Sequence, residues 1–407
     1  MDYRVLALDG GGTWALIQVK ALMQLYSPNT TGHAVLQGFD LVAANSGGSI
    51  VLGALLENLP LNRILQLFED EATRRTIFSK TDHVIDRVLH DLTGFGPKYS
   101  AANKLPALER VLSSAGGTSL PKVVSGIRRP GAQTDLSILI VAFDYDRNRA
   151  RFFRSSASGG ASWGSGDAAE VTLAEAIDAS TNAPVDYFDA PAMFPEPPSD
   201  QMGRYWDGAI AGCNNPILAG VTEAITKQVN PVDIRALSIG TASVARPWRQ
   251  PDDPESPYFQ PLAQSSLKTD LGKLATSILD DPPDAATFLA HVMTGGKEGL
   301  NKPPADSRIV RMNPLISPIK SSGAWGPPPT MTEKDFNFLV NLDMDAVKQS
   351  QVNAISGYAD LWLDDLAPNQ PIRMDGDTLT TELGQDRFSG ALAAWKALTQ
   401  QAAAATV

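Results

Sequence analysis

A serine on a sharp turn is the first residue of this sequence whose surroundings suggest catalysis. Ser46 stands in Ala44-Asn45-Ser46-Gly47-Gly48, between an apolar run at 39–44 that predicts a strand and a helical pattern that starts near Gly48. The motif resembles the G-x-S-x-G nucleophile elbow, with Ala44 in place of the first glycine, and such a turn needs small neighbours. Taken alone, Ser46 fits a nucleophile or the N-cap of a helix equally well.

Two further glycine turns carry groups that a serine hydrolase needs. The run Asp9-Gly10-Gly11-Gly12 follows an apolar stretch and precedes a helical pattern. Its backbone N–H groups could therefore hold a phosphate or an oxyanion at a helix N-terminus. The run Asp207-Gly208-Ala209 offers a carboxylate that could act as a general base. Each of these runs, by itself, is also compatible with a plain turn that binds nothing.

The order of the three turns along the chain is far more specific than any one of them. With Asn214-Asn215-Pro216 shortly after Asp207, this order resembles the patatin-like phospholipase family, which carries a D-G-G-G loop, then a G-x-S-x-G serine, then a D-G-[GA] aspartate. Ala183-Pro184 and the run 237–241 also fit the family pattern. The likeness covers roughly residues 3–245 of the sequence.

The resemblance implies a serine lipid acyl hydrolase, of the phospholipase A or lipase type, that cleaves acyl esters through a Ser–Asp dyad. Ser46 is then the nucleophile and Asp207 the general base, without a histidine, a metal ion or a cofactor. The resemblance implies an oxyanion hole formed by backbone N–H groups of Gly10, Gly11, Gly12 and Gly47. The implied partner is a lipid or another acyl ester, and bacterial relatives include effectors that a ligand or a partner switches on.

Two positions depart from the family pattern. Ala44 replaces a glycine, which is a small change, whereas Trp14 stands where the motif D-G-G-G-x-R-G has arginine. The loop therefore lacks that charge and depends on its backbone N–H groups. Trp14 either lines the substrate groove, where its large apolar surface would favour a neutral or long-chain ester, or belongs to the core.

The apolar runs predict the elements that position these turns. Strands are expected at 5–8, 39–44, 136–143 and 235–239. Glycine-bounded apolar strands that alternate with helical patterns indicate an α/β fold with a parallel sheet. The family resemblance makes this a three-layer sandwich, with a mainly parallel central sheet flanked by helices.

The second half of the sequence changes character after Pro247. We expect a catalytic core at 1–245 and a mostly helical C-terminal extension at 246–407, packed on the same domain. Within the extension, the sequence predicts an edge strand at 308–312 and a long helical stripe at 344–362. The proline-rich run 193–203 is expected to be a loop.

Composition limits the partners and the compartment. Of the 407 residues, 43% are hydrophobic and 19% are charged, which is typical of a globular protein with a sizeable core. The formal net charge of −11 argues against nucleic acid as the main partner and against electrostatic docking on anionic lipid. The single cysteine, Cys213, excludes an intramolecular disulfide and a cysteine-rich metal site. Without a signal pattern or a transmembrane segment, we expect a cytoplasmic protein that meets a membrane surface only transiently.

A Ser-Asp-His α/β-hydrolase is the nearest alternative. It would need a histidine after Asp207, and His291 is the one histidine in that order, since the other three precede Asp207. Two observations disfavour it: only one strand–helix unit precedes Ser46, and His291 lies inside the helical pattern 285–293.

An actin-like ATPase or sugar kinase is an alternative from another class, with the Asp9–Gly12 loop holding phosphate. In that fold the loop joins two hairpin strands, whereas here a helical pattern follows it. The third alternative is a binding or storage protein on the same fold with little activity. The presence of both Ser46 and Asp207 argues against it.

Overall fold

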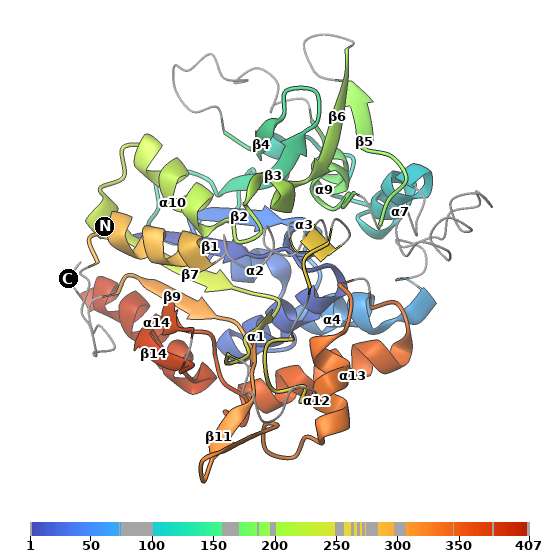
Figure 1. The fold of residues 1–407 in the computed structure, drawn as a ribbon. Helices are drawn as coiled ribbons and strands as arrows, with labels where there is room; N and C mark the ends of the chain where they lie inside the picture. Colours follow the sequence, from blue (N-terminus) through green and yellow to red (C-terminus); the bar gives the residue numbers. More distant parts are fainter. Residues whose placement is uncertain are drawn as a thin grey trace.

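A mainly parallel sheet with helices on both faces forms the centre of the molecule (Figure 1). The computed structural model describes residues 2–72, 74, 101–156, 171–184, 187–195, 201–248, 256–261, 264–266, 269–270, 273, 284–296, 307–344, 346–376 and 378–404. The expected α/β architecture, with extra helices in the C-terminal part, is confirmed.

Among the described residues, the central sheet has eight strands in the order β5-β6-β3-β2-β1-β7-β9, with β4 paired to β3. Strands β3, β2, β1, β7 and β9 run parallel, whereas β4, β5 and β6 pair antiparallel. The strands are β1 (Tyr3–Leu8), β2 (Leu41–Asn45), β3 (Ser137–Asp144), β4 (Arg149–Arg154), β5 (Ala192–Pro195), β6 (Met202–Asp207), β7 (Ile234–Ile239) and β9 (Ile309–Met312).

Helices and short strand pairs surround this sheet. The helices are α1 (Leu16–Leu25), α2 (Gly32–Leu36), α3 (Ser46–Leu56), α4 (Leu61–Glu69), α7 (Lys104–Val111), α8 (Leu120–Val123), α9 (Leu173–Ser180), α10 (Ile217–Thr226), α12 (Glu333–Val340), α13 (Gln349–Leu363) and α14 (Phe388–Ala404). Single 3₁₀ turns are η1 (Gly12–Ala15), η2 (Ala101–Asn103), η4 (Gly208–Ala211) and η5 (Pro231–Asp233). The short pairs are β8 (Ser243–Val244) with β10 (Leu315–Ile316), β11 (Ile319–Ser321) with β12 (Ala324–Gly326), and β13 (Arg373–Asp375) with β14 (Thr380–Leu383).

Strand β1 illustrates why the sheet is covered on both faces. Leu6 and Leu8 belong to the core cluster that contains α1 and α3, whereas Val5 and Ala7 pack in the cluster that contains α10. Successive side chains of a strand point to opposite faces, so an uninterrupted apolar run is stable only when both faces are buried.

The C-terminal third of the chain builds part of this architecture. Strand β9 pairs with β7 and forms one edge of the central sheet. Helix α13 packs against α1 and η1, and α14 packs against β9 and β7. The strand predicted at 308–312 and the helical stripe predicted at 344–362 are confirmed by β9 and α13.

The prediction of a loop at 193–203 is wrong for its described residues. Strands β5 and β6 take up both ends of this run and pair antiparallel. Phe194 is buried and stacks on Tyr205 with ring centroids 4.9 Å apart, while Met193 is exposed on the opposite face. The prolines of this run, Pro195 among them, suggested a loop. A proline is nevertheless tolerated in a strand at the edge of a sheet, and β5 is such a strand.

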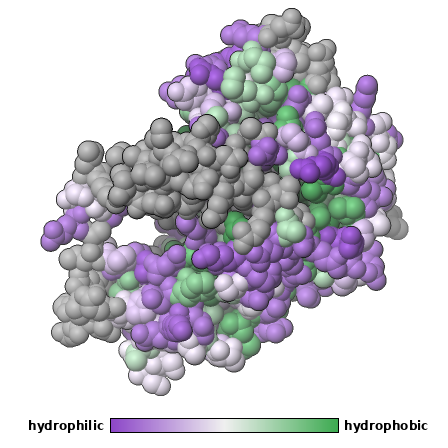
Figure 2. Space-filling model, turned by 90° about the vertical axis from the view of Figure 1, so that its right-hand side faces the viewer, coloured by the Kyte–Doolittle hydropathy of each residue, from purple (hydrophilic) through white to green (hydrophobic). Residues whose placement is uncertain are grey.

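The surface seen in Figure 2 is mostly hydrophilic over its lower half, and apolar side chains form small separate patches. No helix in the described ranges has both the length and the apolar composition that crossing a membrane requires.

Candidate active site

Ser46 lies on a strained turn between β2 and α3. Strand β2 ends at Asn45, and Ser46, the first residue of α3, has a φ angle of 46°, in the left-handed region that is unfavourable for a serine. Such strain is typical of a nucleophile elbow. The turn needs glycine next to Ser46, because a Cβ atom on Gly47 would lie 2.6 Å from the carbonyl oxygen of Gly12.

Asp207 reaches Ser46 through the register of the sheet. Strand β2 pairs with β3 up to Asn45 opposite Val141, and β6 pairs with β3 from Asp207 opposite Ala142. Strand β4 occupies the other edge of β3 over the same stretch, so β2 and β6 share one edge and meet end to end. Their ends therefore bring Ser46 and Asp207 together.

The Asp207 carboxylate is buried and held by hydrogen bonds. Its Oδ1 atom accepts from Nδ2 of Asn45 at 3.1 Å and from the backbone N–H of Ala209 at 2.9 Å. Burial raises the pKa of Asp207, and hydrogen bonds from Ser46, Ala209 and Asn45 and the charge of Lys104 oppose this shift. The net rise makes Asp207 a stronger base than an exposed aspartate.

The glycine loop lies beside Ser46, as predicted. A Cβ atom on Gly10 would lie 3.0 Å from Cβ of Ser46, and the N–H of Gly48 donates to the carbonyl oxygen of Asp9 at 3.1 Å. The loop leads from β1 into η1 and α1, and β1 pairs in parallel with β2. It does not close a hairpin, which argues against the kinase-like alternative.

The backbone donors of this loop are not equivalent. The N–H of Gly10 already donates to the carbonyl oxygen of Asn214 at 2.9 Å, so it is not free for an oxyanion, contrary to the expectation for Gly10. Within the described part of the chain, the N–H groups of Gly11, Gly12 and Gly47 have no backbone or side-chain acceptor.

The C-terminal end of α9 holds both Ser46 and Asp207. The Ser180 hydroxyl accepts the N–H of Ser46 at 2.9 Å, and the carbonyl oxygen of Asn182 accepts the N–H of Asp207 at 2.9 Å. The fully buried Lys104 donates to Oδ1 of Asn182 at 2.6 Å and so supports this end of the helix.

Sequence analysis missed Lys104, Ser180 and Asn182. No motif surrounds them, and the nearby Ala183-Pro184 does not indicate which polar side chains make contacts. Their roles follow from the packing of α7 and α9 at this end of the sheet.

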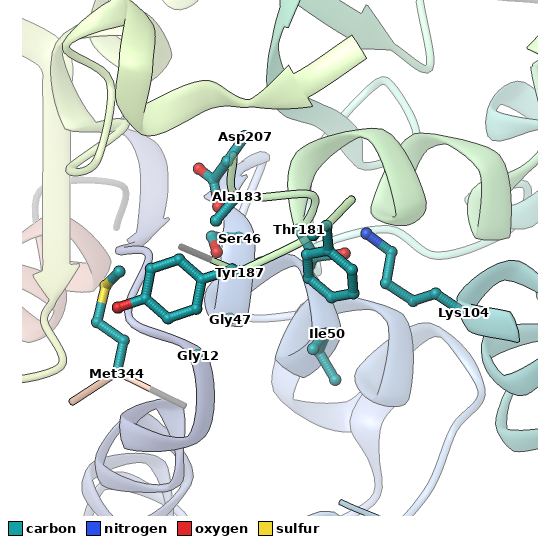
Figure 3. A pocket seen from close by; sticks show the side chains of 11 residues that line it. Gly12, Ser46, Gly47, Ile50, Lys104, Thr181, Ala183, Tyr187, Asp207 and Met344 are labelled. Carbon is teal, nitrogen blue, oxygen red and sulfur yellow. The ribbon is translucent and has the colours of Figure 1, made fainter. Parts of the chain in front are cut away.

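A pocket opens above these residues (Figure 3). The side chains of Ser46 and Asp207 face each other at one end of it. Much of the wall is apolar, and the described lining residues are Gly12, Ser46, Gly47, Ile50, Lys104, Thr181, Ala183, Tyr187, Phe188, Asp207 and Met344. Such a wall suits a hydrocarbon chain next to a polar reacting centre.

Trp14 lies in the core and not in the substrate groove. Its side chain is 6% exposed, belongs to the main core cluster, and is not one of the described residues that line the pocket. Its indole N–H donates to the carbonyl oxygen of Asp343 at 3.1 Å. The expectation that Trp14 forms the substrate groove therefore does not match its position in the core.

The histidines give no support for a Ser-Asp-His triad. Fully buried His291 makes a hydrogen bond with Oγ of Ser307 at 3.0 Å, and His33 contacts the carbonyl oxygen of Leu56 at 3.0 Å. His83 and His90 lie outside the described residues. In the ranges that are described, no histidine lines the pocket.

Comparisons with known proteins identify the family of the chain. A family model for patatin-like phospholipases matches residues 6–221, more than half of the chain. Among solved structures, VipD from Legionella pneumophila is similar, with 10% sequence identity and a TM-score of 0.34 over 88% of this chain and 67% of that chain. No curated protein matches the chain. The matched segment contains the glycine loop, Ser46 and Asp207, and the chain belongs to the patatin-like phospholipase family, a family of lipid acyl hydrolases.

Proposed function

We propose that this chain is a serine lipid acyl hydrolase that cleaves carboxylic esters through a Ser46–Asp207 dyad. The observation that carries the proposal is the juxtaposition of the two side chains: Ser46 and the buried Asp207 carboxylate face each other in one pocket, close enough for the Ser46 side chain to act on the pKa of Asp207. A nucleophile within hydrogen-bond reach of a base whose pKa is raised is the arrangement that covalent catalysis needs.

In the acylation step, Oγ of Ser46 attacks the carbonyl carbon of the ester while Asp207 accepts the serine proton. The carbonyl oxygen becomes an oxyanion, which the N–H groups of Gly11, Gly12 and Gly47 stabilise. The tetrahedral intermediate then collapses: the ester C–O bond breaks, and the leaving alkoxide takes the proton from Asp207. The product is an alcohol and an acyl group bound to Ser46.

Deacylation repeats these steps with water. Asp207 accepts a proton from a water molecule as its oxygen attacks the acyl carbon, and the same N–H groups stabilise the second oxyanion. The bond to Oγ of Ser46 breaks, Oγ takes the proton back from Asp207, and a carboxylic acid leaves. The cycle needs no histidine, because one carboxylate acts as base and then as acid in each half.

The pocket supports an acyl ester of a lipid as the substrate. Ile50, Tyr187, Phe188 and Met344 give its wall an apolar character that suits an acyl chain. We place the reaction in the cytoplasm, at a membrane surface that the enzyme meets transiently. The single cysteine, Cys213, fits a reducing compartment. We take residues 1–245 as the catalytic core and 246–407 as an extension that packs on it and adds strand β9 to its sheet.

A fluorophosphonate probe tests the proposal, because it phosphonylates only an activated serine. We expect mass spectrometry of the full chain to find one adduct, on the peptide that contains Ser46, and no adduct in the Ser46→Ala variant. Ser155→Ala is the control, since Ser155 is also buried, is not one of the described residues that line the pocket, and should leave labelling intact. Labelling that persists in Ser46→Ala would exclude the dyad.

A further inference from the structure

The first residue of the glycine loop is held by a residue outside the segment that the family model matches. Oδ2 of Asp9 lies 2.6 Å from Nη2 of Arg311, a residue of β9. The two side chains are only 5% and 3% exposed, so the ion pair is formed away from water. Strand β9 lies two places from β1 in the sheet, with β7 between them.

Arg311 reaches Asp9 across the intervening strand. The register puts Ala7 of β1 beside Ser238 of β7, and Ser238 beside Arg311. Nη1 of Arg311 donates to Oγ of Ser238 at 2.7 Å, while Nη2 donates to Asp9. The planar guanidinium therefore joins β7 and the end of β1 in one fixed geometry, which the single ammonium group of a lysine does not reproduce.

The ion pair is formed at neutral pH. Burial raises the pKa of Asp9 to about 6, the charge of Arg311 opposes this rise, and Asp284 adds to it. Asp9 is therefore mainly ionised at pH 7 despite its burial. Its other oxygen, Oδ1, has no hydrogen-bond partner in the described part of the chain, so Arg311 is the group that compensates the charge.

The same C-terminal part of the chain also contacts the residues that follow the loop. The carbonyl oxygen of Met344 accepts the N–H of Thr13 at 3.1 Å, and that of Asp343 accepts the indole N–H of Trp14 at 3.1 Å. Met344 also lines the pocket. The loop is thus held at both of its ends by residues of 309–344.

We propose that Arg311 is a positioning residue of the hydrolase, which through its ion pair with Asp9 holds the N–H groups of Gly11 and Gly12 toward the developing oxyanion. The inference rests on the proposed function. Donors in an oxyanion hole act only if they are fixed within about 3 Å of the oxyanion before the reaction, and a shift of about 1 Å costs on the order of 100-fold in rate. Pairing also neutralises Asp9, whose charge would otherwise oppose the oxyanion.

The test compares three variants of the full chain: Arg311→Met, Asp9→Asn and the double variant. Arg311→Met leaves the buried Asp9 carboxylate without its partner, and Asp9→Asn leaves the buried guanidinium without its own, so both should lower the Tm. The double variant leaves no charge there and should recover much of the lost Tm. For p-nitrophenyl ester hydrolysis we expect kcat to fall about 10- to 100-fold in all three, with KM within about threefold, because the loop binds charge that exists only in the transition state.

The double variant separates positioning from stability. If the ion pair only stabilised the fold, kcat would return together with the Tm, and that result would overturn the inference. Arg311→Lys is the milder variant: it keeps the charge but loses one of the two contacts, so we expect an intermediate kcat at a Tm near that of the wild type. Wild-type kcat in Arg311→Met, or in Arg311→Lys if Arg311→Met does not fold, would also overturn it.

Lys20→Met is the matched control. Nζ of Lys20 lies 2.5 Å from Oδ1 of Asp360 and so joins α1 to α13 between the same two parts of the chain, without touching the glycine loop. It should keep wild-type kcat. Full activity in Ser46→Ala, or none in the wild type, would refute the proposed function rather than the role of Arg311.

Discussion

Asn45 at the end of β2 and Asp207 at the end of β6 pair with consecutive residues of one strand, Val141 and Ala142 of β3. Strand β2 is parallel to β3 and β6 is antiparallel, so the two strands run toward each other along the same edge. A hydrogen bond of 3.1 Å joins the two side chains, although 162 positions separate them in sequence. Because Ser46 follows Asn45 directly, this register places the proposed nucleophile next to Asp207, its proposed general base.

The dyad predicts that Ser46 and Asp207 act as one unit. Ser46→Ala and Asp207→Asn should each lower kcat for medium-chain p-nitrophenyl esters by about 1000-fold or more, because either change removes the covalent step. The double variant should be no worse than either single variant. Steady-state kinetics, with circular dichroism to verify folding, measure this.

His291→Ala provides the contrast for these variants, since the nearest alternative assigns His291 to a triad. Its imidazole ring forms a hydrogen bond with Ser307, so the change should affect the stability of the fold more than kcat. Loss of activity equal to that of Ser46→Ala in a folded protein would favour the triad.

Lys104→Met should move the acid limb of the pH–rate profile. Asp207 must be ionised to act as a base, and burial already raises its pKa, while the Lys104 charge opposes the rise. Without that charge the pKa rises further, so kcat/KM should begin to fall at a higher pH than in the wild type. Profiles of kcat/KM between pH 4 and pH 9 measure the shift.

Lys227→Met is the matched control for this experiment. Burial lowers the pKa of both lysines, and each is paired with a carboxylate, Lys104 with Asp178 and Lys227 with Glu223. Lys227 is not one of the charges that act on the pKa of Asp207. The acid limb of the Lys227→Met profile should therefore lie at the same pH as that of the wild type. An acid limb at the wild-type pH in both variants would mean that the charge of Lys104 does not affect the pKa of Asp207.

Trp14→Arg should destabilise the fold. The side chain is buried, and its only described hydrogen bond is the one to the carbonyl oxygen of Asp343. An unpaired charge at such a position costs about 3–5 kcal/mol, so chemical denaturation should show a large loss in the free energy of unfolding. Trp14→Phe, which loses the hydrogen bond but keeps an aromatic ring, should cost about 1–3 kcal/mol. A fully stable Trp14→Arg with altered chain-length preference would indicate that Trp14 faces the groove.

The sequence by itself determined the parts that depend on local backbone requirements. The strands β1, β2 and β3 were predictable because a strand covered on both faces is apolar along most of its length, and β7 and β9 keep this pattern apart from Arg235, Ser238 and Arg311. The glycine loop and the Ser46 turn were visible as well, since positions such as Gly12, with a φ angle of 55°, strongly favour glycine. Motif order then placed Ser46, Asp207 and the loop in one family pattern.

Only the tertiary structure decided which distant residues support that site. The pairing of β5 with β6 could not be predicted, because Pro195 favours a loop in the sequence. Only the sheet order shows that β5 is an edge strand, in which a proline is tolerated. Lys104 and Arg311 had no signal in the sequence, because their contacts follow from helix packing and from the register of three strands. The sequence position of Trp14 allowed it to face either the groove or the core. In the structure, Asp343 and Met344, more than 300 positions away, cover this part of the chain and bury Trp14 in the core. A buried charge or ring is stabilised by partners that the fold brings to it, and a local pattern does not contain them.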